Sequence, residues 1–455
     1  MTQALSSYTG VSQVTKLISS DFAEGDNFGK SVAIDGDLMF IGAPYDDDKG
    51  SKSGSVYVFT RDIAGSPTAN WTQRAKLLAS DGTTDDYFGV SVALCGDTVV
   101  VGASGNNGYS RRIGAAYVFT RVMAGSQTVN FVQRAKLLSS DGIDAYFFGY
   151  SVGISGDTIV VGAFGGLGSA YVFTRDVAGS LTSSWVQRTN LLASDGASGD
   201  LFGHGVAISG DTIVGGAFRH DDRHGSAYIF TRDVAGSLTS SWTQRAKLLA
   251  SDGVADDGFG RSVAISGDTV VIGATGEYAK ASKIGSAYIF TRNVPGSLTA
   301  SWAQQTKLLA SDGAAFDHFG LSVAIDSDTI VVGAYGDDDE VSAHGSAYIF
   351  TRTIAGGLMA SWTERAKLRA SDGQTSGYFG RSLAICSDTV AVGAYDYGSI
   401  GSTYVFAMLP PPRPSPPPTP PPLPPSPSVR APLPSCMYVL LLSHQRAGAK
   451  PKRVY

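Results

Sequence analysis

Two short stretches of this sequence gather carboxylates densely enough to attract cations or basic groups. One is an Asp triplet at 46–48, and the other is the acidic run 337–340. A further acid and two tyrosines lie in loops of the same kind, and tyrosine offers amphipathic contact area. The candidate partner-binding residues are Asp46, Asp47, Asp48, Tyr335, Asp337, Asp338, Asp339, Glu340, Tyr395 and Asp396.

These clusters are compatible with three roles. They could attract a basic partner, or hold a weakly bound divalent ion shared between loops. They equally fit a solvated acidic surface, which soluble proteins often carry. We therefore expect no resident cofactor beyond weak Ca²⁺ binding, and the sequence leaves the identity of any metal ligands open.

For the other reactive side chains, the sequence predicts structural roles. Five aspartates stand two residues before a recurring Phe-Gly pair, where a carboxylate can accept hydrogen bonds from turn backbone. They are Asp26, Asp86, Asp200, Asp257 and Asp317. His220 and His224 share a loop with two aspartates, a weak metal pattern without cysteine partners. No nucleophile elbow, P-loop or dinucleotide fingerprint is present, so we expect a non-enzymatic protein.

All these residues belong to a unit that recurs seven times. The Phe-Gly pairs begin at Phe28, Phe88, Phe148, Phe202, Phe259, Phe319 and Phe379, at intervals of 60, 60, 54, 57, 60 and 60 residues. Each unit carries four strand signals, here called A to D. Examples are Ser91–Cys95, Asp328–Ala334, Gly285–Phe290 and Trp242–Ser251. Four antiparallel strands in a unit of this length predict a β-propeller blade.

The ends of the array predict a closed ring. The last unit stops after strand C at residues 401–406, whereas residues 11–20 match strand D of the other units. The N-terminal segment should therefore complete the last blade, which removes both free edges. The expected fold is all-β, a seven-bladed β-propeller closed by an N-terminal outer strand and followed by a disordered Pro-rich tail.

The paired Phe-Gly and Gly-Ala motifs of all seven units resemble FG-GAP repeats, the unit of integrin α-subunit propellers. The resemblance covers residues 11 to about 409 and implies an extracellular or surface binding propeller. Integrin-type repeats often hold a calcium loop between strands A and B. Here the connection, for example 209–211, is too short to supply five or more oxygen ligands. The sequence is thus closer to FG-GAP repeats of microbial and algal proteins that lack this loop.

The loops predict two unlike faces. In an up-and-down blade the B–C and D–A loops emerge on one face, the variable face, and the A–B and C–D loops on the other, the uniform face. All length variation lies in the B–C loops, whereas C–D loops such as 231–241 are near copies. Function often lies on loops held by a rigid frame, although unconstrained loops also drift. The variable face carries the acidic excess of a chain with net charge −5, which disfavours nucleic acid.

Partner binding is expected to centre on the B–C loops of blades six, seven and one, which are neighbours only in a closed ring. The expected partner is a protein or a glycan, bound by a monomeric propeller at the cell surface or wall. Two alternatives remain. One is a hydrolase or lyase with its site at the channel mouth, and the other is an intracellular scaffold, because no signal peptide is visible.

The C-terminal segment has a different composition from the repeats. Residues 410–434 hold 15 of the 19 prolines and predict a stiff polyproline II spacer. The pattern resembles hydroxyproline-rich cell-wall glycoproteins of plants and green algae, and it also fits a ligand of cytosolic SH3-like domains. We divide the chain into a lead (1–10), the propeller (11–409), the proline-rich linker (410–434) and a basic disordered tail (435–455). No apolar run is long enough to span a membrane.

Overall fold

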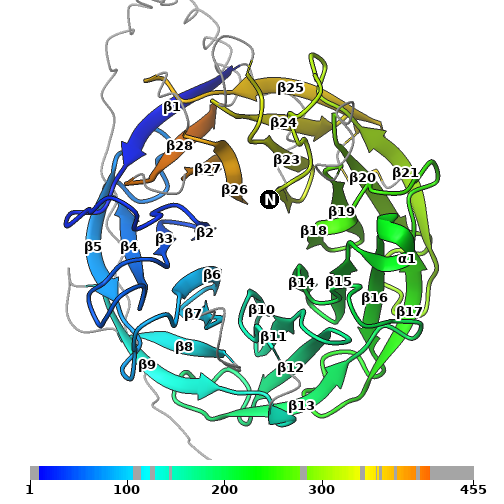
Figure 1. Cartoon of the computed structure of the whole chain (residues 1–455), viewed down its shortest axis with the longest axis horizontal. Coiled ribbons are helices and arrows are strands. Elements are labelled where there is room, and N and C mark those ends of the chain that lie inside the picture. Colours follow the sequence, from blue (N-terminus) through cyan, green and yellow to red (C-terminus); the bar gives the residue numbers. More distant parts are fainter. Residues whose placement is uncertain are drawn as a thin grey trace, which may run out of the picture. The chain divides into compact units, whose positions relative to one another are not determined.

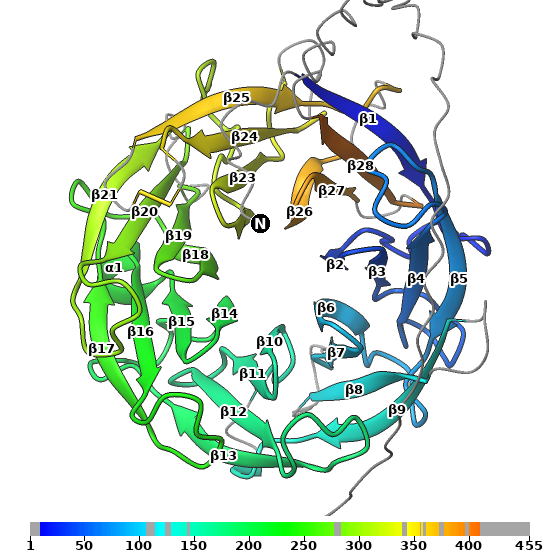
Figure 2. The same ribbon diagram turned by 180° about the vertical axis from the view of Figure 1, so that it is seen from behind.

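The computed structural model describes residues 10–105, 114–122, 129–142, 146–276, 284–338, 344–354, 356–357, 361–372, 377–395 and 400–409. Within residues 10–409 the strands form seven separate four-stranded antiparallel sheets, which confirms the seven-bladed propeller. Figures 1 and 2 show strand A of each blade beside the central channel and strand D on the outer rim. The C-terminal segments predicted from residue 410 onward lie outside the described residues.

The first four blades follow one another in sequence. Blade one comprises β2 (Ser31–Asp35), β3 (Leu38–Ala43), β4 (Ser55–Arg61) and β5 (Trp71–Leu77). Blade two comprises β6 (Phe88–Cys95), β7 (Thr98–Ala103), β8 (Ala115–Val122) and β9 (Asn130–Leu137). Blade three comprises β10 (Ser151–Ser155), β11 (Thr158–Ala163), β12 (Ser169–Arg175) and β13 (Trp185–Leu191). Blade four comprises β14 (Val206–Ser209), β15 (Thr212–Ala217), β16 (Ser226–Arg232) and β17 (Trp242–Leu248), with the single turn α1 (His220–Arg223), whose central residues have positive φ, in its B–C loop.

The remaining blades complete the circle. Blade five comprises β18 (Phe259–Ser266), β19 (Thr269–Ala274), β20 (Ser286–Arg292) and β21 (Trp302–Leu308). Blade six comprises β22 (Val323–Asp326), β23 (Thr329–Ala334), β24 (Ser346–Arg352) and β25 (Trp362–Leu368). Blade seven comprises β26 (Phe379–Cys386), β27 (Thr389–Ala394), β28 (Ser402–Leu409) and β1 (Gly10–Leu17).

The N-terminal strand closes the ring as the sequence predicts. β1 runs antiparallel to β28, from the pair Gly10 and Leu409 to the pair Leu17 and Thr403. It makes the contacts that strand D makes in other blades. Gln13 exchanges two hydrogen bonds with Ser371 of the preceding D–A loop, as Gln73 does with Ser20. The predicted strand extends three residues too far, because residues 18–20 already belong to the loop that leads into blade one.

The Phe-Gly and Gly-Ala motifs hold neighbouring blades together. Gly42 of blade one packs so closely on the next blade that a Cβ there would collide with the carbonyl oxygen of Gly89. The Ser31 hydroxyl donates to that same oxygen at 2.8 Å. Ser382 of blade seven donates to Gly29 of blade one at 2.7 Å, so the closing joint uses the same contact. The constant spacing between the two motifs is therefore a requirement of blade packing.

Apolar side chains fill the space between blades. Strand B is buried along its whole length in every blade, which fits its Val- and Ile-rich sequence. The Phe of each Phe-Gly pair is also buried, and Phe28 packs edge-on against Tyr57 with ring centroids 5.4 Å apart. Each hydrophobic cluster draws on two adjacent blades, and the one that contains Leu17 joins blade seven to blade one. The ring therefore depends on every joint.

The uniform face owes its regularity to a repeated ion pair. Arg61 at the end of strand C pairs with Asp37 of the A–B turn at 2.9 Å and lies over the Trp71 ring. It also donates to Ser66 O in its own C–D loop and to Thr389 Oγ1 of the neighbouring blade. Equivalent pairs are Arg175–Asp157, Arg232–Asp211, Arg292–Asp268 and Arg352–Asp328. The recurring Trp row is thus packing, and the same Arg–Asp pair holds the C–D loops of these five blades.

Candidate functional site: the acidic rim of the variable face

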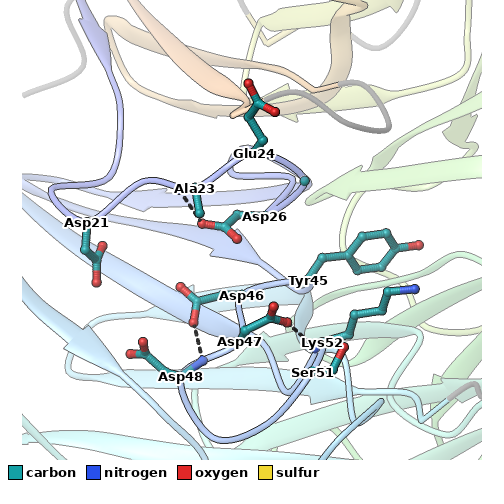
Figure 3. A pocket seen from close by; sticks show the side chains of 11 residues that line it. Asp21, Ala23, Glu24, Asp26, Tyr45, Asp46, Asp47, Asp48, Ser51 and Lys52 are labelled. Atoms are coloured by element: carbon teal, nitrogen blue, oxygen red, sulfur yellow. Dashed lines mark hydrogen bonds between the residues drawn. The ribbon is translucent and has the colours of Figure 1, made fainter.

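The Asp triplet of blade one borders an acidic cavity of about 550 Å³ on the variable face. Figure 3 shows carboxylates from the D–A loop at residues 21–26 on one side and from the B–C loop at residues 46–48 on the other. The described lining includes six acids and a single lysine, Lys52. The cavity therefore presents a surplus of negative charge.

Asp46 is the buried anchor of this loop. Only 3% of the residue is exposed, and its carboxylate accepts hydrogen bonds from the Tyr57 hydroxyl and the Lys76 ammonium, both at 2.7 Å. Its other oxygen accepts from the Asp48 backbone N–H. Asp46 thus fixes the loop internally, and its contacts leave little of it for a partner.

The Lys76 ammonium lies among three carboxylates. Its Nζ is 2.8 Å from Asp21, 2.7 Å from Asp46 and 2.7 Å from Asp48. Burial alone would lower the pKa of Lys76, but the hydrogen bonds to these aspartates outweigh it and raise that pKa. Oxygens of the three acids lie within 4.8 Å of one another, close enough to hold a metal ion. In this structure the lysine takes the central position that such an ion would need.

Asp337 of blade six repeats the arrangement of Asp46. It is 3% exposed, and its carboxylate accepts a hydrogen bond from the Tyr348 hydroxyl. It also forms an ion pair with Lys367 Nζ at 2.7 Å. In blade four His220 occupies this place, with its Nε2 2.8 Å from Lys247 Nζ. In blades one, four and six, the position three residues after the Gly-Ala motif therefore attaches the B–C loop to strands C and D.

A Tyr–Asp–Lys group underlies these attachments in most blades. The strand C tyrosine and the strand D lysine both bond the aspartate of the D–A loop, as Tyr117 and Lys136 bond Asp81. The hydrogen bond from Lys136 is the largest influence on the pKa of Asp81, which is lowered. Blade three has Asn190 in place of the lysine. These groups are structural, and blades one and six add a second aspartate to them.

Three of the sequence-predicted acids remain open to solvent. Asp47, Asp48 and Asp338 are exposed, although Asp48 also pairs with Lys76 and Asp47 accepts from the Lys52 backbone N–H. The other predicted acids, Asp339, Glu340 and Asp396, lie outside the described residues. The structure thus separates exposed acids from the buried anchors Asp46 and Asp337.

The aspartates that precede the Phe-Gly pairs stabilise turns, as the sequence predicts. In all five, the carboxylate accepts the backbone N–H of the residue three positions earlier, at 2.6–2.9 Å. Burial, and then the charges of Asp337 and Asp338, raise the pKa of Asp317 to about 6 against an opposing bond from the Ala314 N–H. The acidic rim therefore influences the ionisation of its own scaffold.

The repeat unit also matches a known family. The model of the FG-GAP repeat matches seven segments, at residues 11–59, 71–119, 131–173, 185–230, 242–290, 302–350 and 362–406. The chain belongs to the FG-GAP repeat family. Each match begins with a strand D segment and ends with the strand C that follows it, so the first match starts in β1.

Other comparisons add little to this assignment. None of the curated proteins compared with the FG-GAP chain matches it. Among solved structures, the β-propeller domain of Cps50 (Swd1) from Myceliophteria thermophila is similar, at 10% identity and a TM-score of 0.49. That match covers 86% of this chain and 99% of the other. It carries no argument about function.

The two tyrosines predicted to bind a partner of this FG-GAP propeller lie closer to the central channel than the acidic loops do. Tyr335 and Tyr395 are 7% and 6% exposed, and both line a cavity of about 220 Å³. The residue after each Phe-Gly pair also lines this cavity, one from every blade: Lys30, Val90, Tyr150, His204, Arg261, Leu321 and Arg381. The cavity is therefore at the channel mouth, on the axis of the ring.

Sequence reasoning missed this channel mouth of the FG-GAP propeller. The signal was present, because the residues after Phe-Gly and after Gly-Ala vary inside otherwise fixed motifs. Burial, followed by the charge of Arg261, lowers the pKa of His204 to about 3, so this imidazole is neutral. The described residues that line the cavity include no carboxylate, so they offer no paired acid and base. No helix among the described residues is long and apolar enough to cross a membrane.

Proposed function

We propose that this FG-GAP propeller is a non-enzymatic binding or adhesion module of the cell surface or wall. Its ligand would be a basic region of a protein, or a glycan, held on the acidic rim of the variable face. The observation that supports this most is the 550 Å³ cavity, whose acids exceed its internal cations. A cavity lined by like charges focuses the field and favours an oppositely charged partner.

The contrast between the two faces supports the same role. On the uniform face, the described C–D loops that carry the Arg–Asp pair use their polar groups to hold adjacent blades. On the variable face, Asp46 and Asp337 anchor the described acidic loops, whereas Asp47, Asp48 and Asp338 remain exposed, although Asp48 also pairs with Lys76. A rigid ring with individual exposed loops is a common design for recognition. FG-GAP repeats are typical of extracellular or surface proteins, which fits this role.

The test must spare the structural anchors. We would replace Asp47, Asp48 and Asp338 by Asn together and keep Asp46 and Asp337. Binding to cell-surface protein and glycan arrays at low salt should fall tenfold or more, since the exposed charge is lost while the loops stay attached.

A charge-matched control lies on the uniform face. Asp62, Asp176 and Asp233 are exposed there, and their triple change to Asn removes the same charge. This control should retain binding. Equal loss in both triple variants would indicate a nonspecific charge effect, and full binding by the first variant would rule out the acidic rim as the contact surface.

A further inference from the structure

The described residues of the channel mouth collect positive charge without a carboxylate among them. Lys30, Arg261 and Arg381 come from blades one, five and seven and line one cavity of about 220 Å³. Among the described residues, none of these three cations forms an ion pair. The arginines of the uniform face are different, because Arg61 and its equivalents each lie within 3.1 Å of an aspartate.

Aromatic rings surround these cations. The Arg381 guanidinium lies 4.8–5.1 Å from the ring centres of Tyr335, Tyr378 and Tyr395. Lys30 Nζ lies 4.7 Å from the Tyr395 ring and donates to its hydroxyl at 2.7 Å. Ring faces attract cations, but they do not neutralise them. Within the part of the chain that the structure describes, buried Arg381 Nε has no hydrogen-bond acceptor, and the guanidinium donates through another nitrogen to the Tyr395 carbonyl at 3.4 Å.

The cavity has room for a small group. A second cavity of about 230 Å³ shares Lys30, Val90, Tyr150 and Tyr395 with the first, and its described lining also contains no carboxylate. Either cavity is smaller than the 300–1,000 Å³ typical of sites for drug-sized ligands. The space thus suits one ring and its substituent.

We propose that the channel mouth binds an oxyanion carried on a small ring, namely the carboxylate or phosphate of an acidic sugar unit. The oxyanion lies between the cations from blades one, five and seven, and guanidinium groups can bond such anions with two parallel N–H donors. The sugar ring lies in the remaining space of the cavity, which Tyr335 and Tyr395 also line. This site is separate from the acidic rim and does not depend on the function proposed for it.

The first experiment uses isothermal titration of the full-length protein with four probes: glucuronate, glucose 6-phosphate, glucose and inorganic phosphate. We expect saturable binding of at least one of the two charged sugars, and weaker or no binding of glucose. The charged sugar that binds more tightly identifies the source of the oxyanion. Failure of both to bind overturns the proposal, as does equally tight binding of glucose or of inorganic phosphate.

Single-charge variants then locate the site. Arg261→Gln and Arg381→Gln should each lower the affinity tenfold or more, and Lys30→Gln should do the same. Lys49→Gln removes an exposed charge from the blade-one loop and should leave affinity within twofold. Because Arg381 packs on three tyrosines, each melting temperature is checked, and Arg261→Gln serves if Arg381→Gln does not fold. Unchanged affinity in folded Arg261→Gln and Lys30→Gln overturns the assignment.

The acidic-rim triple variant separates this inference from the proposed function. Asp47→Asn, Asp48→Asn and Asp338→Asn should keep full oxyanion affinity even where binding to cells is lost. A parallel loss of oxyanion binding would contradict a separate site at the channel mouth.

Discussion

The acidic rim and the channel mouth lie on the same face of the propeller but use charge in opposite ways. At the rim, Lys76 pairs with three aspartates at once, and Glu24, Asp47 and Asp338 are exposed to solvent. At the mouth, Arg381 is surrounded by tyrosines and has no acid beside it among the described residues. Whether a charged side chain is free for a ligand therefore depends on its pairing within the protein, and not on the number of acids or bases nearby.

The largest effect should come from breaking the ring that supports both regions. Deletion of residues 1–20 removes β1, exposes the edge of β28 and takes Leu17 out of a cluster shared by blades seven and one. We expect the melting temperature to fall by on the order of 10 °C, with loss of several kcal/mol. Differential scanning calorimetry measures this, and a melting temperature equal to that of the full chain would contradict closure by β1.

The second-largest effect on stability should follow loss of Lys76, the central cation of the rim. Lys76→Met leaves Asp46 buried without its ion pair. We expect the free energy of unfolding to fall by about 3 kcal/mol. This is at the low end for buried ion pairs because Asp21 and Asp48 are half-exposed. Chemical denaturation measures the free energy of unfolding.

The matched control for this change is Lys136→Met in blade two. Lys136 pairs with Asp81 alone, and both side chains are more than a third exposed, so its loss should cost about 1 kcal/mol or less. Millimolar calcium should raise the melting temperature of Lys76→Met and not that of Lys136→Met. Equal costs for both lysines would show that the three-carboxylate cluster has no special role.

A pH-dependent effect should appear where the rim meets the mouth. Asp317 has a pKa raised to about 6, and His318 beside it stacks on Tyr335. Because the folded state then binds a proton more readily than the unfolded state, its contribution to stability is present at low pH and is lost as pH rises through about 6. Asp317 should therefore favour the folded state at pH 5 relative to pH 7, whereas His204 and His318, whose pKa values are lowered by burial, act in the opposite direction over this range.

Two variants sharpen this prediction, with melting temperatures recorded in steps across that range. Asp317→Asn should therefore lose stability relative to the wild type as pH falls from 7 to 5, and Asp338→Asn should show a smaller loss because it removes a neighbouring negative charge. An identical pH dependence of stability in the wild type and in Asp317→Asn would disprove the assignment to Asp317.

The smallest expected effect concerns the proline-rich C-terminal segment. Truncation after Leu409 should leave the melting temperature unchanged within error, because a segment with so many prolines offers few backbone donors and no apolar face. It should also leave oxyanion binding unchanged. A clear fall in either quantity would mean that this segment contacts the propeller.

The sequence by itself determined the fold. Seven Phe-Gly and Gly-Ala pairs at fixed spacing recur because Gly42 and Gly89 must meet across a joint, and the match of residues 11–20 to strand D predicted closure since the last blade lacks that strand. Turn stabilisation by residues such as Asp317 was predictable for the same local reason. Periodic patterns record contacts that every blade makes.

Only the tertiary structure decided which charged residues are free. Asp46 and Asp47 are adjacent in the chain, yet one is buried against Tyr57 and Lys76 while the other is exposed. Lys30 and Arg381 are far apart in sequence, yet ring closure places both in one cavity. Pairing and burial depend on side chains brought together from different strands and blades, and a linear count of charges contains no information about those distances.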